Sequence, residues 1–515
     1  MSVMTAEERT FLDAISRLAY CNPFLPERID GERQALGRAF TESAEPWNVN
    51  PDRVDLQVNV TRLIEQSERM VEALRDRLAV LPRLNDADRR RYDDLVLFVL
   101  YHRYREPFDD LMRQMAQGRD KGRDRVSFYR RFGAETERLL DVAGRQTDRG
   151  LHIPHLFACF FQLRRAFEQI FSCIIGMSPA AVRLRAEVWQ SIFTHDMRRF
   201  QRILYARMGD MTCLVTGPSG TGKELVARAI GLARYIPFDV EAQRFAHDYQ
   251  ASFHPLSLSA LSPTLIESEL FGHKRGAFTG ALADHEGWLR KCTSSGAVFL
   301  DEIGELDMAI QVKILRVLQS RTFQRIGDTE TLPFEGKIIA ATNRDLASEV
   351  QAGRFREDLY YRLCSDTILT PSLRDQVRDN PGELRHLITH IIQRIVGEAD
   401  DSLIGQVEQW IAGRLGPTYP WPGNVRELEQ CVRNILVRGE YRPLRHAPTT
   451  PIGGREALAA EICRGTLTAD EMLGQYCALV YASCGSYVET ARRLGMDRRT
   501  VRRRIDPVLA RRLPA

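Results

Sequence analysis

Apolar and polar positions along the chain follow three successive patterns. Over residues 1–185 apolar residues recur at helical spacing, and few strand patterns occur. From about Met211 to Thr370, short apolar runs such as MTCLVTG, GAVFLDE and GKIIAATN alternate with helical segments, which is typical of a parallel sheet with crossover helices. Helical spacing then resumes up to about Arg438. One helical face near the N-terminus is formed by Leu63, Met70, Val71, Leu74 and Leu78.

These patterns predict a multidomain chain, because 515 residues with 44% hydrophobic content can bury several cores. We expect an all-α N-terminal domain over residues 1–185 and an α/β domain over 186–438, of which about 373–438 form a helical lid. The stretch EYRPLRHAPTTPIGG, rich in proline and with a Gly-Gly pair, marks 439–466 as a linker. A small all-α domain is expected over 467–515.

The longest apolar stretch, His155 to Met177, predicts a buried helix. It is interrupted by Arg164, Arg165 and Glu168, which would be costly at the middle of a bilayer. The N-terminus lacks the basic start and apolar middle of a secretory signal. Ten scattered cysteines form no CxxC pair, as expected of reduced core thiols. We therefore expect a cytoplasmic protein that does not bind membranes.

Positive charge is concentrated at the C-terminal end. The whole chain has 72 basic and 68 acidic residues, formally +4. Residues 487–515 alone hold nine arginines against Glu489, Asp497 and Asp506. Such a local excess of arginine is the pattern expected of a nucleic-acid contact, because neutralising phosphates supplies the sequence-independent part of the affinity.

A phosphate-binding loop opens the α/β block, where the apolar run before Gly217 leads into GPSGTGKE and the helical pattern LVARAI follows. Glycines let backbone amides surround phosphates, the helix N-terminus adds its positive dipole, and Lys223 can reach the β and γ phosphates. The strand before and the helix after the loop favour this interpretation over a chance match. Glu224 stands where the general pattern has a magnesium-binding Ser or Thr, so the metal needs other ligands. The predicted nucleotide-binding residues are Gly217, Pro218, Ser219, Gly220, Thr221, Gly222, Lys223 and Glu224.

Two carboxylates at the end of a later apolar strand, AVFLDE, are the candidates for that task. Asp301 would hold magnesium, and Glu302 would polarise the attacking water. Taken alone, the segment is also compatible with a buried strand that ends in a solvated acidic turn. Together with the phosphate-binding loop, it predicts a nucleotide hydrolase that uses ATP and magnesium.

Six motifs occur in a characteristic order: GPSGTGKE, ESELFGHKRGAFTGA, FLDEIGELD, IIAATNRDL, FREDLYYRL and YPWPGNVRELE. In this order they resemble the sigma-54-dependent transcription activators, bacterial enhancer-binding proteins whose motor is an AAA+ ATPase. The resemblance covers roughly Met211 to Val437. It implies an activator that binds upstream DNA and uses ATP hydrolysis to remodel RNA polymerase holding sigma-54.

The GAFTGA segment resembles the surface loop by which these activators touch sigma-54. Glycines at both ends permit a mobile tip that can present Phe278 and Thr279 to a partner. Standing alone, the same six residues would fit a glycine turn that tucks Phe278 into the core. The implied sigma-54 contact consists of Gly276, Ala277, Phe278, Thr279, Gly280 and Ala281.

The resemblance also assigns roles to four polar residues. Asn343 is similar to the strand-end residue that senses the γ phosphate, and Arg426 to a lid arginine that contacts nucleotide in its own subunit. Arg356 and Arg362 are similar to arginines that reach a neighbouring subunit's nucleotide, where such a residue can accelerate hydrolysis about 10³- to 10⁵-fold. This geometry implies self-association, from a dimer up to a hexameric ring. Each arginine taken singly also fits an ordinary surface helix charge.

Two features depart from the family pattern. Ser257 stands where family members usually carry an asparagine that links the catalytic glutamate to the nucleotide state, and serine has a shorter reach. The stretch from Leu232 to His254 is longer than the usual connection. Hydrolysis is therefore a firmer expectation than its coupling to the loop.

The C-terminal segment reads as three short helices separated by Cys-Gly-Ser and Gly-Met-Asp turns, and it resembles a Fis-type helix-turn-helix. An apolar inner face is expected from Ala491, Leu494, Gly495, Val501 and Ile505. The residues expected to face double-stranded DNA are Arg498, Arg499, Thr500, Arg502 and Arg503. A solvated charged helix is the alternative. Paired copies would favour a DNA site with two-fold symmetry.

The N-terminal domain matches no sensory module, and it lacks the strand and helix alternation of a phosphoacceptor receiver. We expect it to bind an unidentified ligand or protein and to restrain the motor, with a purely structural or oligomerising role as the alternative. Two rival functions remain for the whole chain. It could be an AAA+ DNA-binding repressor, or a remodeller that does not act on sigma-54, but neither accounts for loop, motor and tail together.

Overall fold

The computed structural model describes residues 4–43, 58–80, 85–117, 125–141, 152–443, 458, 462–463, 465, 467–484 and 486–510. The chain divides into two compact units, Met1–Glu440 and Tyr441–Ala515. Most of the predicted linker, 439–466, lies outside the described residues.

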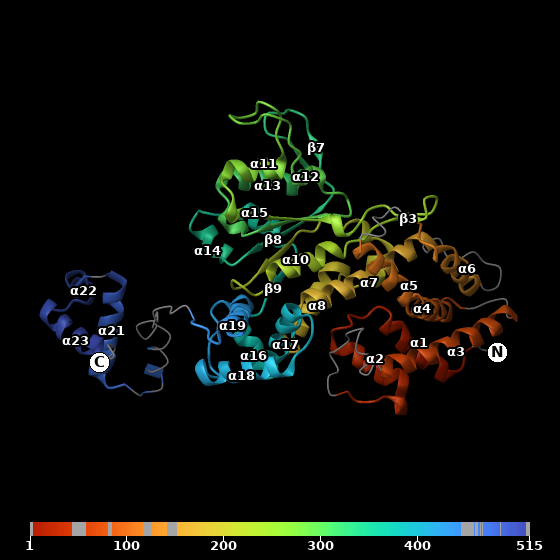
Figure 1. Cartoon of the computed structure of the whole chain (residues 1–515), viewed down its shortest axis with the longest axis horizontal. Coiled ribbons are helices and arrows are strands. Elements are labelled where there is room, and N and C mark those ends of the chain that lie inside the picture. The colour runs from red at the N-terminus through yellow and green to blue at the C-terminus, as the bar shows by residue number, and fades with distance from the viewer. Residues whose placement is uncertain are drawn as a thin grey trace. The chain divides into compact units, whose positions relative to one another are not determined.

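The N-terminal part is helical, as predicted, and its described residues up to 193 contain no strand (Figure 1). Its apolar faces meet in one core that includes Leu63, Val71, Leu74 and Leu78 of the predicted face. The helices are α1 (Ala6–Leu18), α2 (Pro26–Leu36), α3 (Val58–Val80), α4 (Asp86–Arg103), α5 (Arg105–Ala116), α6 (Tyr129–Leu140), α7 (Ile153–Cys173) and α8 (Pro179–Phe193).

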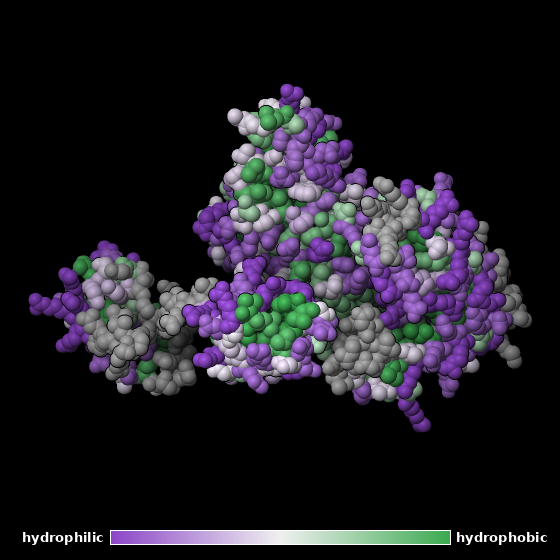
Figure 2. Space-filling view, in the orientation of Figure 1, coloured by the Kyte–Doolittle hydropathy of each residue, from purple (hydrophilic) through white to green (hydrophobic). Residues whose placement is uncertain are grey.

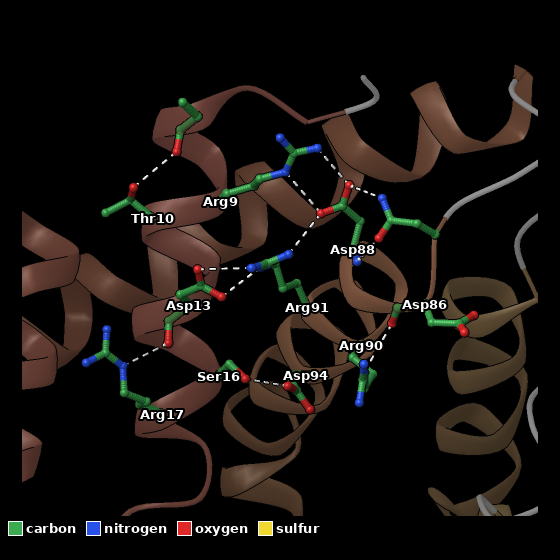
Figure 3. A network of polar contacts seen from close by, with 12 residues as sticks. Arg9, Thr10, Asp13, Ser16, Arg17, Asp86, Asp88, Arg90, Arg91 and Asp94 are labelled. Carbon is green, nitrogen blue, oxygen red and sulfur yellow. Dashed lines mark hydrogen bonds and ion pairs between the residues drawn. The ribbon is translucent and has the colours of Figure 1, made fainter. Parts of the chain in front are cut away.

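Ion pairs hold α1 against α4 (Figure 3). Arg9 donates to both carboxylate oxygens of Asp88 at 3.0 and 2.8 Å. Arg91 donates to Asp13 at 2.7 Å and to Asp88 at 3.0 Å, so Asp88 receives two guanidiniums. The side chain of Asp88 is buried, and the hydrogen bond from Arg9 lowers the pKa of that carboxyl. Removing either arginine would leave a buried charge with less compensation.

Helix α7 confirms the buried helix predicted from the long apolar stretch. Its two adjacent arginines point to different neighbours: Arg164 pairs with Asp109 of α5, and Arg165 donates to the backbone oxygens of Leu232 and Arg234 at 2.9 and 2.7 Å. Among the helices that the structure describes, none is long and apolar enough to cross a membrane.

A five-stranded parallel sheet forms the centre of the first unit, in the order β4-β5-β8-β1-β9. All its neighbouring strands are parallel, which accounts for their nearly continuous apolar runs. The strands are β1 (Cys213–Thr216), β4 (Phe253–Ser257), β5 (Ala297–Asp301), β8 (Lys337–Thr342) and β9 (Thr367–Leu369).

The two faces of this sheet contribute to different cores. Side chains such as Phe299 and Ile339 join the core that also holds the N-terminal helices, together with α10 (Lys223–Leu232). Side chains such as Leu300 and Ile338 join a second core. The helices of that second layer are α11 (Pro263–Phe271), α12 (Trp288–Lys291), α13 (Met308–Ser320), α14 (Leu346–Gln351) and α15 (Glu357–Leu363).

A helical subdomain follows the sheet in the range predicted for the lid. It consists of α16 (Leu373–Asp379), α17 (Glu383–Val396), α18 (Asp401–Arg414) and α19 (Asn424–Arg438). Buried Glu383, in the first turn of α17, accepts hydrogen bonds from the backbone amides of Met177 and Ser178 at 2.7 and 2.8 Å. The start of α8 is thereby fixed to the lid.

The long connection from Leu232 to His254 forms a hairpin of β2 (Phe238–Asp239) and β3 (Arg244–Phe245), followed by a short 3₁₀ turn. The ring of Phe245 stacks on Phe161 of α7 with centroids 4.1 Å apart, and Phe238 packs edge-on against Phe157 at 4.8 Å. The extra length thus builds a contact between the motor and the N-terminal helices, which the sequence did not indicate.

The domain boundary expected at 185/186 falls inside α8. This helix packs against α10, β9 and α16, and Val188 and Phe193 are buried in the core that the two regions share. Residues 1–440 therefore pack as one continuous unit, in which α8 packs on β9 and α10, and α7 packs on α10.

Among its described residues, the C-terminal unit has the helices α21 (Ala469–Cys484), α22 (Tyr487–Leu494) and α23 (Arg498–Ala510). Gly495 ends α22 in the left-handed conformation, with φ of 64°. Cys477, Ala491, Val501 and Ile505 form its small core, so three of the residues expected on the inner face are buried there.

Candidate functional site

The phosphate-binding loop connects β1 to α10, and three of its glycines are required by geometry. Gly217, Gly220 and Gly222 have φ values of 140°, 77° and 88°. A Cβ on Gly217 would lie 2.2 Å from the hydroxyl of Thr370, and one on Gly220 would lie 2.2 Å from the carbonyl oxygen of Gly423. The loop is therefore clamped between the end of β9 and the lid.

Lys223, the first residue of α10, is buried at the base of this loop. Its Nζ donates to the backbone oxygens of Gly217 and Pro218 at 3.0 and 3.2 Å. Burial lowers the pKa of this ammonium, and the nearby carboxylates of Glu302 and Asp301 oppose the shift. Within the described residues no carboxylate pairs with it directly, so a phosphate would supply the missing counter-charge. The loop therefore fits a nucleotide.

The two predicted carboxylates lie at the carboxyl edge of the same sheet. Asp301 ends β5, and burial raises the pKa of its carboxyl above the ordinary range. Glu302 follows in the left-handed conformation, with φ of 57°, and its Oε2 accepts a hydrogen bond from the backbone amide of Asn343 at 3.3 Å. A strained backbone at a strand end re-aims a side chain, as functional sites often require.

Sheet register places Ser257 beside Asp301, at the end of the neighbouring strand β4. The Ser257 side chain is exposed, as is that of Asn343. The sequence predicted a role for each of these residues separately. The parallel register of the strands places their strand ends at the same edge of the sheet.

Lid residues close the other side of the loop. Asn424 Nδ2 donates to the backbone oxygen of Ser219 at 2.8 Å, and its Oδ1 accepts from the amide of Leu373 at 2.9 Å. Arg426 lies over the loop, with Nη1 3.5 Å from the hydroxyl of Ser219. Sequence reasoning assigned Arg426 but missed Asn424 and Thr370. For Asn424 the signal was its place in the PGNVREL motif.

Arg356 and Arg362 lie at the two ends of α15. Arg356 pairs with Asp358 at 2.7 Å, whereas the exposed guanidinium of Arg362 makes no hydrogen bond or ion pair with any residue that the structure describes. Neither arginine contacts the phosphate-binding loop of its own chain in this set of residues. Both are available to a second chain.

The GAFTGA segment is the tip of a loop after α11, and a hairpin of β6 (Thr322–Phe323) and β7 (Leu332–Pro333) lies beside it. The loop and the hairpin are in contact. The amide of Lys274 donates to the oxygen of Ile326 at 3.0 Å, and a Cβ on Gly327 would lie 2.7 Å from that of Ala277. Both project at the top of the view in Figure 1, above α11 and beside β7.

Within this tip, Gly276 and Gly280 have φ values of 82° and 102°. Phe278 is half-buried against the ring of His273, with centroids 4.9 Å apart, while Thr279 is exposed. The following Leu282 is 86% exposed, which is unusual for a large apolar residue. Figure 2 shows apolar residues interspersed with hydrophilic ones at this end. Five of the six predicted contact residues are exposed or half-buried on this projecting tip, whereas Ala281 is buried, and the core burial of Phe278 that was the alternative is not observed.

On the C-terminal unit, four arginines predicted to face DNA are exposed along α23 and its start, and Thr500 is half-buried between them. Arg492 and Arg493 of α22 instead pair with Glu489. The exposed set is Arg498, Arg499, Arg502 and Arg503.

A phosphate-binding loop, strand-end carboxylates and a four-helix lid around one parallel sheet define a P-loop ATPase of the AAA+ class. The family model described as the sigma-54 interaction domain matches residues 193–369. The transcriptional regulatory protein ZraR of Escherichia coli O157:H7 is 37% identical over 330 residues, which is 64% of this chain and 67% of that protein.

Two further relatives match over shorter spans. The Nif-specific regulatory protein of Azotobacter vinelandii is 44% identical over 251 residues, 48% of this chain and 44% of that protein. The sigma54-dependent transcriptional regulator SfnR of Pseudomonas fluorescens is 40% identical over 228 residues, 44% of this chain and 57% of that protein. The chain belongs to the sigma-54-dependent transcriptional activators, and its motor is an ATP-binding AAA+ ATPase.

Proposed function

We propose that this activator converts ATP hydrolysis at the sheet edge into movement of the GAFTGA tip against sigma-54. The observation that carries the proposal is the arrangement of one segment. The chain leaves Ser257, beside Asp301, passes through α11, and reaches Phe278 and Thr279 at the projecting tip. A change at the carboxylates therefore has a short covalent path to the proposed polymerase contact.

At the hydrolytic site, each residue has a defined task. Asp301 would hold magnesium, and the bound metal would neutralise negative charge that develops on the phosphates. Glu302 orients and polarises water, and its bond from the Asn343 amide fixes the carboxylate. Lys223 and the loop amides bind the phosphates, and Arg426 contacts the nucleotide from the lid.

Completion of the site requires neighbouring chains. The guanidinium of Arg362 is exposed and has no partner within the described residues. The guanidinium of Arg356 pairs with Asp358 alone among these residues, so each arginine can reach across an interface. We propose a hexameric ring, with dimers as a smaller state, in which these arginines act in trans.

The C-terminal unit would deliver the ring to upstream double-stranded DNA. Helix α23 follows the left-handed turn at Gly495 and exposes arginines that can contact the major groove or its phosphates. Paired copies favour a two-fold symmetric site. Because its partner is RNA polymerase, the protein would act in the cytoplasm.

The N-terminal helices would regulate the motor, since α7 and α8 pack on its helix α10. Helix α7 packs directly against α10, the helix that begins at Lys223. A ligand or protein that shifts α7 therefore acts one helix away from the phosphate site.

The decisive experiment measures open-complex formation with sigma-54 polymerase and ATP. We expect wild type to open the promoter. Thr279→Ala should retain hydrolysis without promoter opening, and Glu302→Gln should bind ATP but lose both activities, with hydrolysis falling about 10²- to 10⁴-fold. Glu305→Gln, one turn beyond Glu302 and paired with Arg344, is the matched control and should behave as wild type. Promoter opening by Thr279→Ala at the wild-type rate would contradict a motor that acts through the tip.

A further inference from the structure

The N-terminal domain contains a cavity of 220 Å³ that is separate from the nucleotide site. It is lined by the end of α1, the α1–α2 connection, α2, residues 40–43, α3, α4, the start of α5, α7, α8 and α9 (Met197–Arg202). A dry apolar cavity of about 150 Å³ is known to hold a benzene molecule, so this one has room for a substituted aromatic ring.

Aromatic and aliphatic side chains supply most of the cavity wall. Phe98, Phe160 and Phe167 line it together with Leu63 and Leu97. Tyr101 meets Phe160 edge-on, with centroids 5.6 Å apart. This lining favours a flat, apolar body.

Four of the residues in the wall have polar groups that can only donate hydrogen bonds. Trp189 lines the cavity and is 3% exposed, and its indole N–H, which can only donate, has no partner among the described residues. Arg28, Arg105 and Arg164 add three guanidiniums, which also can only donate. These three guanidiniums pair with two carboxylates, because Arg28 contacts Glu32 and both Arg105 and Arg164 contact Asp109.

The carboxylates in the cavity wall, which can accept hydrogen bonds, are already paired with arginines. The carboxylate of Glu32 is buried and already engaged by Arg28, and Glu42 pairs with Arg33 at the exposed rim. Burial, and then Arg105 and Arg164, lower the pKa of His102 to about 3, so this imidazole is neutral and adds no charge. Its Nδ1 is also without a partner in the described part of the chain. An occupant that supplies acceptors would satisfy more of this wall than one that supplies donors.

We propose that this cavity is an effector site for a small aromatic carboxylate, whose ring contacts the phenylalanine wall and whose oxygens accept from Trp189 and the arginines. The occupant is defined by chemistry: one or two fused rings, one negative charge and no bulky branches.

Helix α7 connects this site to the motor. Phe160, Leu163, Arg164 and Phe167 recur at helical spacing and face the cavity. On another side of the same helix, Phe157 and Phe161 pack on the β2–β3 hairpin, and Arg165 binds the carbonyls at the end of α10. A ligand that orders the cavity-facing side of α7 would therefore also affect the β2–β3 hairpin and α10, which contact the same helix. This coupling step rests on the proposed regulation of the motor, whereas binding does not.

The test is calorimetric titration of the full chain with benzoate and 2-naphthoate, beside the neutral isostere benzamide. We expect at least one acid to bind with sub-millimolar affinity, at least tenfold more tightly than benzamide. Trp189→Phe removes one donor and keeps an aromatic ring, so acid affinity should fall roughly ten- to a hundredfold while benzamide binding is unchanged. Failure of both acids to bind, or equal binding of benzamide, would overturn the site.

Filling the cavity provides a second, independent arm. Leu163→Trp should abolish acid binding, and Leu163→Met, which conserves volume, should retain it. Circular dichroism and basal ATPase rate establish that both variants fold. Acid binding by Leu163→Trp at wild-type affinity would place the ligand elsewhere and refute the assignment.

The ATPase rate of each variant with and without acid tests the coupling. A change of at least twofold in wild type and Leu163→Met, but not in Leu163→Trp, supports the effector role. Binding without any change in ATPase rate would overturn that role and leave the binding site standing. Because calorimetry needs no polymerase, failure of the sigma-54 experiment would not affect this result.

Discussion

At the residue scale, the nucleotide site is built to receive charge that the single chain does not provide. Lys223 has carbonyl oxygens as its hydrogen-bond acceptors within the described residues, and the guanidinium of Arg362 has no polar partner there. Lys223 would be paired by a phosphate of the nucleotide bound to its own chain. Arg362 would be paired by a phosphate of the nucleotide bound to a neighbouring copy. These two requirements give separable predictions, because one is met within a chain and the other between chains.

Mixing of two inactive variants tests the arginine supplied in trans. Arg362→Ala and Glu302→Gln should each lose hydrolysis, with the arginine loss about 10³-fold or more. Mixed at equal concentration, they should recover measurable ATPase activity, because an intact Arg362 from one chain can serve an intact Glu302 of the other. The measurement is phosphate release against subunit ratio. Arg354→Ala, an exposed arginine paired with Glu349, is the control. No recovery at any ratio would contradict action between chains.

At the element scale, the β2–β3 hairpin carries much of the contact between the motor and α7. Phe245 is 4% exposed and stacks on two phenylalanine rings of α7. Burial of this kind is worth several kcal/mol, so a short two-stranded element can link two large regions.

Phe245→Ala should destabilise the first unit by about 3 to 5 kcal/mol and weaken the response of the motor to its N-terminal helices. Thermal denaturation of the full chain with ATPase assays measures both effects. Glu241→Ala removes an exposed side chain in the turn of the same hairpin and should change the melting temperature little. An unchanged melting temperature for Phe245→Ala would show that the hairpin contributes no net stability.

Helix α23 gives a second prediction at this scale. Arg499→Ala or Arg503→Ala should weaken DNA binding and reduce its dependence on salt by about one ion each if the residue contacts phosphate. Arg492→Ala, which breaks a pair with Glu489 on α22, is the matched arginine control. Fluorescence anisotropy with promoter DNA over a salt series distinguishes them. Equal losses for all three variants would point to nonspecific charge rather than a recognition helix.

At the scale of the whole first unit, regulator and motor share one core. Helix α10 lies against the sheet face that includes Phe299 and Ile339, and α7 and α8 pack on α10, so removing α7 and α8 exposes apolar surface of the motor itself. Loss of several buried side chains, at about 1.5 to 3 kcal/mol each, approaches the total stability of a domain.

Truncation should therefore depend sharply on its position. A fragment beginning at residue 186 should melt well below one beginning at 152, which retains α7 and α8, and should lose ATP binding. Thermal melts with and without ATP provide the measurement, since a bound nucleotide raises the melting temperature of a folded site. Equal melting temperatures would contradict structural dependence of the motor on these helices.

The secondary structure and the short functional motifs could be predicted from the sequence alone. Helical and strand periodicity predicted the all-α and α/β regions, and short motifs predicted the loop at Lys223, the carboxylates at Asp301 and Glu302, and the arginine-rich last helix. These features could be predicted because their physical basis is local. A glycine-rich turn, an apolar strand or a helical face involves residues close together in the chain.

Only the tertiary structure decided which of these segments meet. Parallel register brought Ser257 beside Asp301, packing placed Thr370 and Asn424 against the loop, and the long connection after Leu232 became a hairpin on α7. The cavity around Trp189 likewise arises from segments far apart in the chain that lack a shared motif. Such contacts depend on pairings between distant residues, and one sequence contains no local pattern that specifies them.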